Sequence, residues 1–175
     1  MSQAVARRIL FVCHGNICRS TMAQFVFEDL VRRTVGADGF VVDSAATSRE
    51  ELGNPPHPGT VRKLRHEGIA VGRHRARQLR RDEYGSWDLI VYMDDENEWG
   101  LGRILGTDST GGIDDPAAKC VKLLSFVPDG AGLCPPPRDR RGHVRDVADP
   151  WYTGDFDATY RDVLAGCEGL LESLS

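Results

Sequence analysis

One short segment carries the residue types that nucleophilic chemistry on phosphate needs. Cys13 and Arg19 are separated by five residues, and Ser20 follows at once. A thiolate can attack phosphorus, a planar guanidinium matches two phosphate oxygens, and a hydroxyl can stabilise a thiolate as it leaves. The spacing therefore predicts a cysteinyl-phosphate intermediate, with Cys13 as the nucleophile and Arg19 as the phosphate clamp.

The residues between Cys13 and Arg19 are suited to a loop that binds an oxyanion through its backbone. The loop follows an apolar run and precedes a helical pattern, so its N–H groups would gather at the positive end of a helix. Gly15 and Asn16 tolerate unusual backbone angles, and the missing G-K-[ST] ending argues against a nucleotide-binding loop. We expect contacts with the substrate from six residues: His14, Gly15, Asn16, Ile17, Cys18 and Ser20.

The elements that must position this loop follow an alternating pattern. Four short apolar segments predict buried parallel strands: RRILFVC, GFVVDSA, WDLIVYMD and CVKLLSF. Helical spacing or helix boundary signals appear over residues 20–35, 58–67 and 155–175. We therefore predict one α/β domain over residues 1–175, doubly wound, with a four-stranded parallel twisted sheet and helices on both faces.

The topology also selects a general acid from two Asp-Pro pairs. Ligands of such folds bind at the carboxyl ends of the strands. Asp115 precedes the predicted fourth strand, whereas Asp149 follows it and should lie on the same edge as Cys13. We expect Asp149 to protonate the leaving group and then to activate water. Residues 128–149 before it are interpreted as a long surface excursion.

Composition excludes several other classes. The 175 residues carry a formal net charge of −4, which gives no general attraction to nucleic acid or to an anionic membrane. The apolar run near the start is too short for a signal peptide or a membrane span, and five cysteines without a paired framework indicate reduced thiols, so we expect a cytoplasmic protein. No cofactor and no metal is implied, because the chain itself supplies nucleophile, oxyanion site and acid.

Together these motifs resemble the low-molecular-weight protein tyrosine phosphatase family. CHGNICRS after ILFV is similar to its phosphate-binding signature, and the likeness continues through DSAATS, GNPPHP, HRARQL, YMDDEN and DVADPWYTGDF. The resemblance implies the family's fold and the hydrolysis of phosphotyrosine in protein substrates, among which a tyrosine kinase is a candidate partner. It also implies that inorganic phosphate or vanadate would inhibit.

The resemblance assigns further residues. Asn16, Ser44 and His74 are similar to the hydrogen-bond network that holds the family's phosphate loop, and Asp94 matches a supporting acidic residue. The aromatic walls that the family builds around the substrate ring correspond to Trp151 and Tyr152.

Some positions depart from the family pattern or stay open. His14 and Thr21 replace a large aliphatic residue and a proline, and Glu50 stands where some relatives have an aromatic residue. His14 at the rim could therefore influence which phosphopeptides bind. Cys18 is interpreted either as core packing or as a partner that captures oxidised Cys13 in a disulfide.

Three other functions are alternatives to phosphotyrosine hydrolysis. A thiol-dependent arsenate reductase needs closely spaced relay cysteines, and Cys120 and Cys134 are too far apart. A non-catalytic phosphate-binding module would be expected to lack Cys13, Arg19 or Asp149, all of which are present. A protein arginine phosphatase remains an alternative for the substrate.

Overall fold

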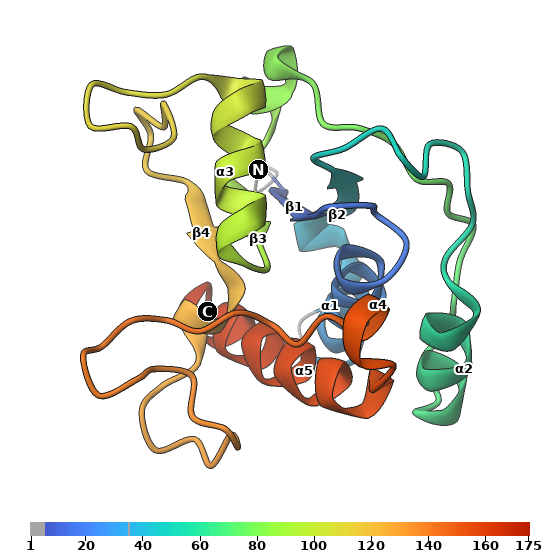
Figure 1. Cartoon of the computed structure of the whole chain (residues 1–175). Coiled ribbons are helices and arrows are strands. Elements are labelled where there is room, and N and C mark those ends of the chain that lie inside the picture. Colours follow the sequence, from blue (N-terminus) through green and yellow to red (C-terminus); the bar gives the residue numbers. More distant parts are fainter. Residues whose placement is uncertain (1–5, 35) are drawn as a thin grey trace, which may run out of the picture.

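The computed structural model describes residues 6–34 and 36–175. It contains a parallel sheet in the order β2-β1-β3-β4, as Figure 1 shows together with the helices. The strands are β1 (Arg7–Cys13), β2 (Phe40–Ala46), β3 (Leu89–Tyr92) and β4 (Cys120–Lys122). The longer helices are α1 (Arg19–Thr34), α2 (Pro58–His66), α3 (Asp95–Leu105) and α5 (Phe156–Ser173), and α4 (Pro150–Thr153) is a single turn.

This architecture confirms the predicted α/β fold with a four-stranded parallel sheet. The predicted helix boundaries are close to those found, with Asp155 serving as the N-cap of α5 through a hydrogen bond to Ala158 N. Val35, the predicted last residue of the first helix, and residues 1–5, which begin the segment considered as a leader, lie outside the described residues.

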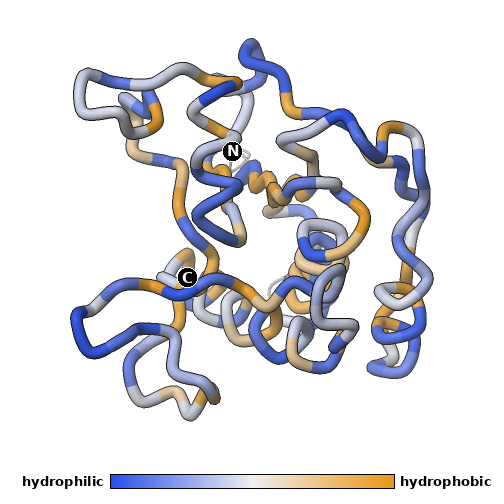
Figure 2. Tube along the Cα trace, in the orientation of Figure 1, coloured by the Kyte–Doolittle hydropathy of each residue, from blue (hydrophilic) through white to orange (hydrophobic). Residues whose placement is uncertain are grey.

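The central strands are buried on both faces, so their side chains alternate between two cores. Ile9, Phe11 and Cys13 of β1 pack in a cluster with α1 and α5. Leu10 and Val12 face a second cluster, which includes residues of α3. Figure 2 shows the same pattern, with apolar residues along the strands and hydrophilic residues along much of the outer loops.

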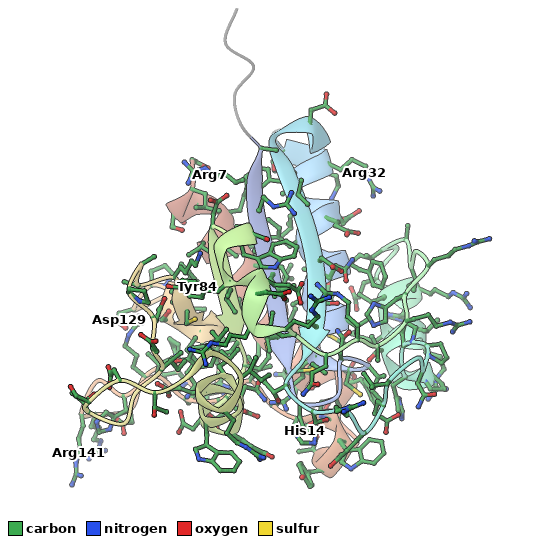
Figure 3. The ribbon with its side chains drawn as sticks, turned by 90° about the horizontal axis from the view of Figure 1, so that it is seen from above. Arg7, His14, Arg32, Tyr84, Asp129 and Arg141 are labelled. Carbon is green, nitrogen blue, oxygen red and sulfur yellow. The ribbon has the colours of Figure 1, made fainter. Side chains whose placement is uncertain are left out.

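The chain order creates a crevice at the carboxyl edge of the sheet. From β1 the chain passes through α1 to β2, whereas β3 pairs with the opposite side of β1 and leads into α3 on the other face. The loops after β1 and β3 therefore diverge, and a ligand can bind between them. Arg7 and His14 lie at opposite ends of β1 in Figure 3, which places the Cys13 loop at this edge.

The fourth strand is shorter than the sequence predicted. Only Cys120–Lys122 pairs with β3, and Leu123–Phe126 forms a 3-10 turn, η3. The turn packs tightly against α5, where a Cβ atom added at Gly169 would lie 2.2 Å from the carbonyl oxygen of Phe126. Burial of Leu123 and Leu124 in this contact outweighs the strand pattern of the segment.

Candidate active site

A pocket of about 270 Å³ opens at the carboxyl edge of the sheet. It brings together ten of the residues that the sequence singled out: Cys13, His14, Gly15, Ile17, Cys18, Arg19, Glu50, Asp149, Trp151 and Tyr152. Two further glutamates, Glu51 and Glu96, complete the lining. The phosphate loop, residues 13–19, thus faces the segment that contains Asp149.

Cys13 lies at the base of this loop with its sulfur surrounded by donors. The side chain is almost fully buried, and the Asn16 N–H donates to its Sγ at 3.3 Å. Ser20 Oγ lies 3.1 Å from the same sulfur, in hydrogen-bond contact. Both groups can stabilise negative charge on sulfur, as a nucleophilic thiolate requires.

Asn16 holds the loop in its turned conformation from behind. Its φ of 59° lies in the left-handed region, which asparagine tolerates better than most residues. The Nδ2 group donates to Ser20 Oγ and to Ser44 Oγ, each at 2.9 Å, and Ser44 Oγ donates to Gln24 Oε1 at 2.6 Å. These side chains are buried, so the network is dry and fixes the loop shape.

His74 supports the same turn from the other side. Its Nε2 lies 2.7 Å from the carbonyl oxygen of Asn16, which also accepts from Thr21 Oγ1 at 3.0 Å. Burial lowers the pKa of His74, although the bond to Asn16 opposes that effect, so the ring is neutral at pH 7 and donates from Nε2. Ser44 and His74 are therefore both hydrogen-bonded to Asn16, and none of the three residues is part of the pocket lining.

Arg19 is a buried cation between two carboxylates. Its Nη1 donates to Asp94 Oδ2 at 2.5 Å, and its Nη2 lies 2.9 Å from Asp149 Oδ2. Burial disfavours the charged guanidinium, but the negative charges of Cys13, Asp94 and Asp149 outweigh it and raise the pKa of Arg19. Asp94 also caps α3 by accepting from Asn97 N at 2.7 Å, which fixes the arginine to a helix end.

Asp149 stands at the opposite wall of the pocket. It caps the short α4 by accepting from Trp151 N at 3.0 Å, and Trp151 and Tyr152 extend from this turn as exposed aromatic side chains. Asp115, the other aspartate followed by proline, lies at the amino end of β4, where it accepts from Lys119 N and Cys120 N. Asp115 is therefore absent from the pocket lining.

The residues before Asp149 are tied down by Lys122, a contact that the sequence analysis missed. Lys122 ends β4 and is largely buried, with its Nζ 2.6 Å from both Asp95 Oδ1 and Asp146 Oδ1. The same group donates to the carbonyl oxygen of Val144 at 2.9 Å. Burial disfavours the charged amine, but these partners outweigh it and raise the pKa of Lys122. The position of Lys122 within the apolar segment CVKLLSF could have indicated a buried lysine with acidic partners.

Arg145 makes a second attachment. Its guanidinium binds the buried carboxylate of Asp162 in α5 through two hydrogen bonds of 2.7 and 2.6 Å. Asp162 Oδ2 also accepts from Ala148 N at 3.0 Å. We call residues 144–152 the acid segment. The sequence analysis placed Val144, Arg145 and Asp146 in the surface excursion and assigned them no contacts. The tip of this excursion, marked by Arg141 in Figure 3, lies away from His14.

His14 connects two glutamates at the rim. Its Nε2 lies 3.0 Å from Glu50 Oε2, and its Nδ1 lies 3.6 Å from Glu96 Oε1. Glu51 also lines the pocket but was not singled out, and neither was Glu96. Glu96 lies in the first turn of α3, directly after β3, and therefore at the carboxyl edge of the sheet. This position could have predicted that Glu96 lines the pocket.

The two thiols of the loop differ. Burial, followed by the nearby negative charges of Cys13 and Asp149, raises the pKa of Cys18 to about 12, so Cys18 stays protonated. All five cysteines are free, and within residues 6–34 and 36–175 no group of three or more His, Cys, Asp or Glu could hold a metal ion. In the same residues no helix is long and apolar enough to span a bilayer.

The fold and this pocket place a cysteine and a buried arginine together at the switch point of an α/β sheet. The family model for low molecular weight phosphotyrosine protein phosphatase matches residues 8–175. The chain belongs to this family, and it is a phosphatase of the same class as its relatives.

Individual relatives support this assignment. The low molecular weight protein-tyrosine-phosphatase YfkJ of Bacillus subtilis is 38% identical over 95% of this chain and 94% of its own. The low molecular weight phosphotyrosine protein phosphatase of Sus scrofa is 33% identical over 99% of both chains. The crystal structure of YfkJ superposes with a TM-score of 0.82, covering 99% of this chain and 97% of its own at 35% identity.

Proposed function

We propose that this protein hydrolyses phosphotyrosine in protein substrates, with Cys13 as nucleophile, Arg19 as phosphate clamp and Asp149 as general acid and base. The convergence of these three side chains on one pocket carries the proposal: Arg19 Nη2 lies 2.9 Å from Asp149 Oδ2, and Cys13 lines the same pocket. A buried cation, a thiol that accepts from a backbone N–H and a nearby carboxyl group are what transfer of a phosphoryl group to sulfur requires.

In the first step the Cys13 thiolate attacks phosphorus. The sulfur–phosphorus bond forms as the bond from phosphorus to the tyrosine oxygen breaks, and Asp149 gives its proton to that oxygen. The phosphate dianion competes with Asp149 for Arg19. Arg19 and the loop N–H groups stabilise the charge on the equatorial oxygens.

In the second step water attacks the phosphocysteine. Asp149, now a carboxylate, takes a proton from this water, and the bond from phosphorus to sulfur breaks. Ser20 lies 3.1 Å from the sulfur and can donate its hydroxyl to the leaving thiolate. Inorganic phosphate is released and Cys13 is regenerated. The remaining loop residues, His14 to Cys18, are proposed to contact the phosphate or the rim of the substrate.

The surroundings of the pocket support an aromatic phosphate ester on a protein. Trp151 and Tyr152 are 62% and 79% exposed and flank the opening, where they can pack against a phenyl ring. A tyrosine kinase that carries phosphotyrosine is one candidate substrate. Inorganic phosphate and vanadate should inhibit by occupying the loop, and the free thiols are compatible with a cytoplasmic location.

Hydrolysis of a matched peptide panel tests the proposal. The same sequence would carry phosphotyrosine, phosphoserine or phosphoarginine, and arsenate reduction would be followed in parallel. We expect turnover of the phosphotyrosine peptide and its inhibition by vanadate. Preference for the phosphoarginine peptide would contradict the assignment of phosphotyrosine as the substrate. Thiol-dependent reduction of arsenate would contradict the assignment of the reaction as phosphate-ester hydrolysis.

A further inference from the structure

We infer that a second hollow beside the pocket binds the stretch of substrate next to the phosphotyrosine and selects an aromatic and an acidic residue there; this rests on the proposed function. The hollow has a volume of about 640 Å³. One wall comes from the loop after β2 and the other from α3, and it shares with the catalytic pocket three lining residues: His14, Glu50 and Glu96. The two sites are therefore continuous, with His14, which is marked in Figure 3, between them.

The walls of this hollow are fixed to the phosphate loop. Thr47 N donates to the carbonyl oxygen of Cys13 at 2.9 Å, and Gln78 Nε2 donates to the carbonyl oxygen of Thr47 at 3.0 Å. Helix α3 approaches so closely that a Cβ atom added at Gly100 would lie 2.8 Å from Thr47 Cβ. The hollow is thus formed before a ligand arrives, which lowers the entropy lost on binding.

Trp99 supplies an exposed aromatic surface in the hollow. The residue is 66% exposed and lies in α3, one turn beyond Glu96. Arg103 places its guanidinium carbon 4.9 Å from the centre of the indole ring, a cation–π contact within the hollow. Large exposed aromatic surfaces are frequent anchors for protein partners.

Charge changes sign along the hollow. Glu50 and Glu96 border the catalytic pocket and both face His14, whereas Arg49 and Arg103 are exposed and positively charged. A substrate side chain near the arginines should therefore be acidic. The aromatic preference nearer the phosphotyrosine comes from Trp99.

The spacing along α3 sets the distance to the phosphotyrosine. Arg103 lies seven positions after Glu96, which corresponds to roughly 10 Å along the helix at about 1.5 Å per residue. An extended peptide advances about 3.3 Å per residue, so about three substrate residues cover this length. We place the acidic residue three positions from the phosphotyrosine and the aromatic residue one or two positions from it.

Steady-state kinetics with paired substrates test this inference. The test peptide would carry phenylalanine two positions and aspartate three positions from the phosphotyrosine, and it would be made in two versions, with both residues before or both after the phosphotyrosine. It would be compared with a peptide that has alanine at both positions and with a small aryl phosphate. Trp99→Ala and Arg103→Ala should each lower kcat/KM for the peptide with phenylalanine and aspartate about fivefold to twentyfold. Turnover of the small ester should not change, and neither should any rate in the control Arg140→Ala, an exposed arginine outside both sites.

Equal kcat/KM values for wild type and variants on both peptides would overturn the inference. So would a loss on the small ester as large as that on the peptide. Titration of the same peptides into Cys13→Ser protein measures binding to the hollow without turnover. Arg103→Ala in this background should raise Kd for the aspartate peptide by about fivefold. An unchanged Kd would contradict peptide binding in the hollow, whether or not the wild-type protein turns over the peptide. If turnover is absent but Kd changes, only the proposed function is contradicted.

Discussion

The phosphate loop and the acid segment face the same pocket but are held by different interactions. Asn16 is fixed behind the loop by the uncharged side chains of Ser44 and Gln24, a network that adds no formal charge near the Cys13 sulfur. The acid segment is fixed by the charged pairs of Lys122 and of Arg145 with Asp162. An uncharged network thus shapes the middle of the phosphate loop, while the Arg19–Asp94 pair adds an ionic contact at its end. Ionic attachments instead position the long acid segment, which must place one carboxyl group.

The largest effect should come from removing the nucleophile of the phosphate loop. Cys13→Ser should lower kcat by roughly 10⁴-fold to 10⁶-fold, as loss of a catalytic nucleophile does in other hydrolases. Vanadate or phosphate should still bind, because Arg19 and the loop N–H groups remain. Calorimetric titration with phosphate checks this. Ordinary turnover by the variant would contradict the role of Cys13.

Asp149→Ala tests the acid segment and should distinguish leaving groups. For an aryl phosphate with a basic phenol we expect a loss of about 10²-fold to 10⁴-fold. An ester with a very acidic phenol needs little protonation, so its first step should suffer much less and phosphocysteine should accumulate. Burst amplitudes for both esters provide the measurement. Asp115→Ala is the matched control and should change neither rate.

Arg145→Met tests whether the ionic attachment positions Asp149. Because the buried carboxylate of Asp162 would lose its cation, unfolding in urea should show a loss of about 2–4 kcal/mol. Turnover of the basic-phenol ester should fall about tenfold or more, with a smaller loss for the acidic-phenol ester. Arg141→Met, on the exposed tip of the excursion, is the control. Equal losses for both esters would assign Arg145 a purely structural role.

The smallest effect concerns the pH dependence of the phosphate loop. The pKa of His74 is lowered in the folded protein by burial, so the unfolded chain takes up this proton more readily. The contribution of His74 to stability is therefore complete above pH 6.5 and is lost as pH falls through the lowered pKa. His74→Gln should therefore reduce the loss of stability between pH 7.5 and 5.5. Parallel urea titrations of wild type and variant measure it; identical pH dependence would contradict this expectation.

The sequence revealed the phosphate loop well because its chemistry is local. Cys13, Arg19 and Ser20 lie within one strand–loop–helix unit, so spacing alone predicts their proximity. Asp149 also needed the strand order, which the alternating pattern supplied. Trp99 and Arg145 could not be assigned, because the helix face and the loop path that place them depend on packing between distant elements.

Strand β4 illustrates the same limit. The apolar run CVKLLSF has the composition of a strand, but half of it turns into η3 where α5 approaches the backbone at Gly169. The contact joins segments more than forty residues apart, and single-sequence propensity contains no information on it.

The apolar cluster that β1 and α5 share has a consequence for synthesis on the ribosome. Strand β1 and helix α5 share one apolar cluster, yet α5 begins at Phe156, far along the chain from Cys13. At the usual pace of translation the sheet face waits on the order of 10 s for this helix. During that interval the strand that carries the nucleophile is exposed to other nascent chains, so changes that slow translation between Cys13 and Phe156 should lower soluble yield while leaving the purified enzyme unaltered.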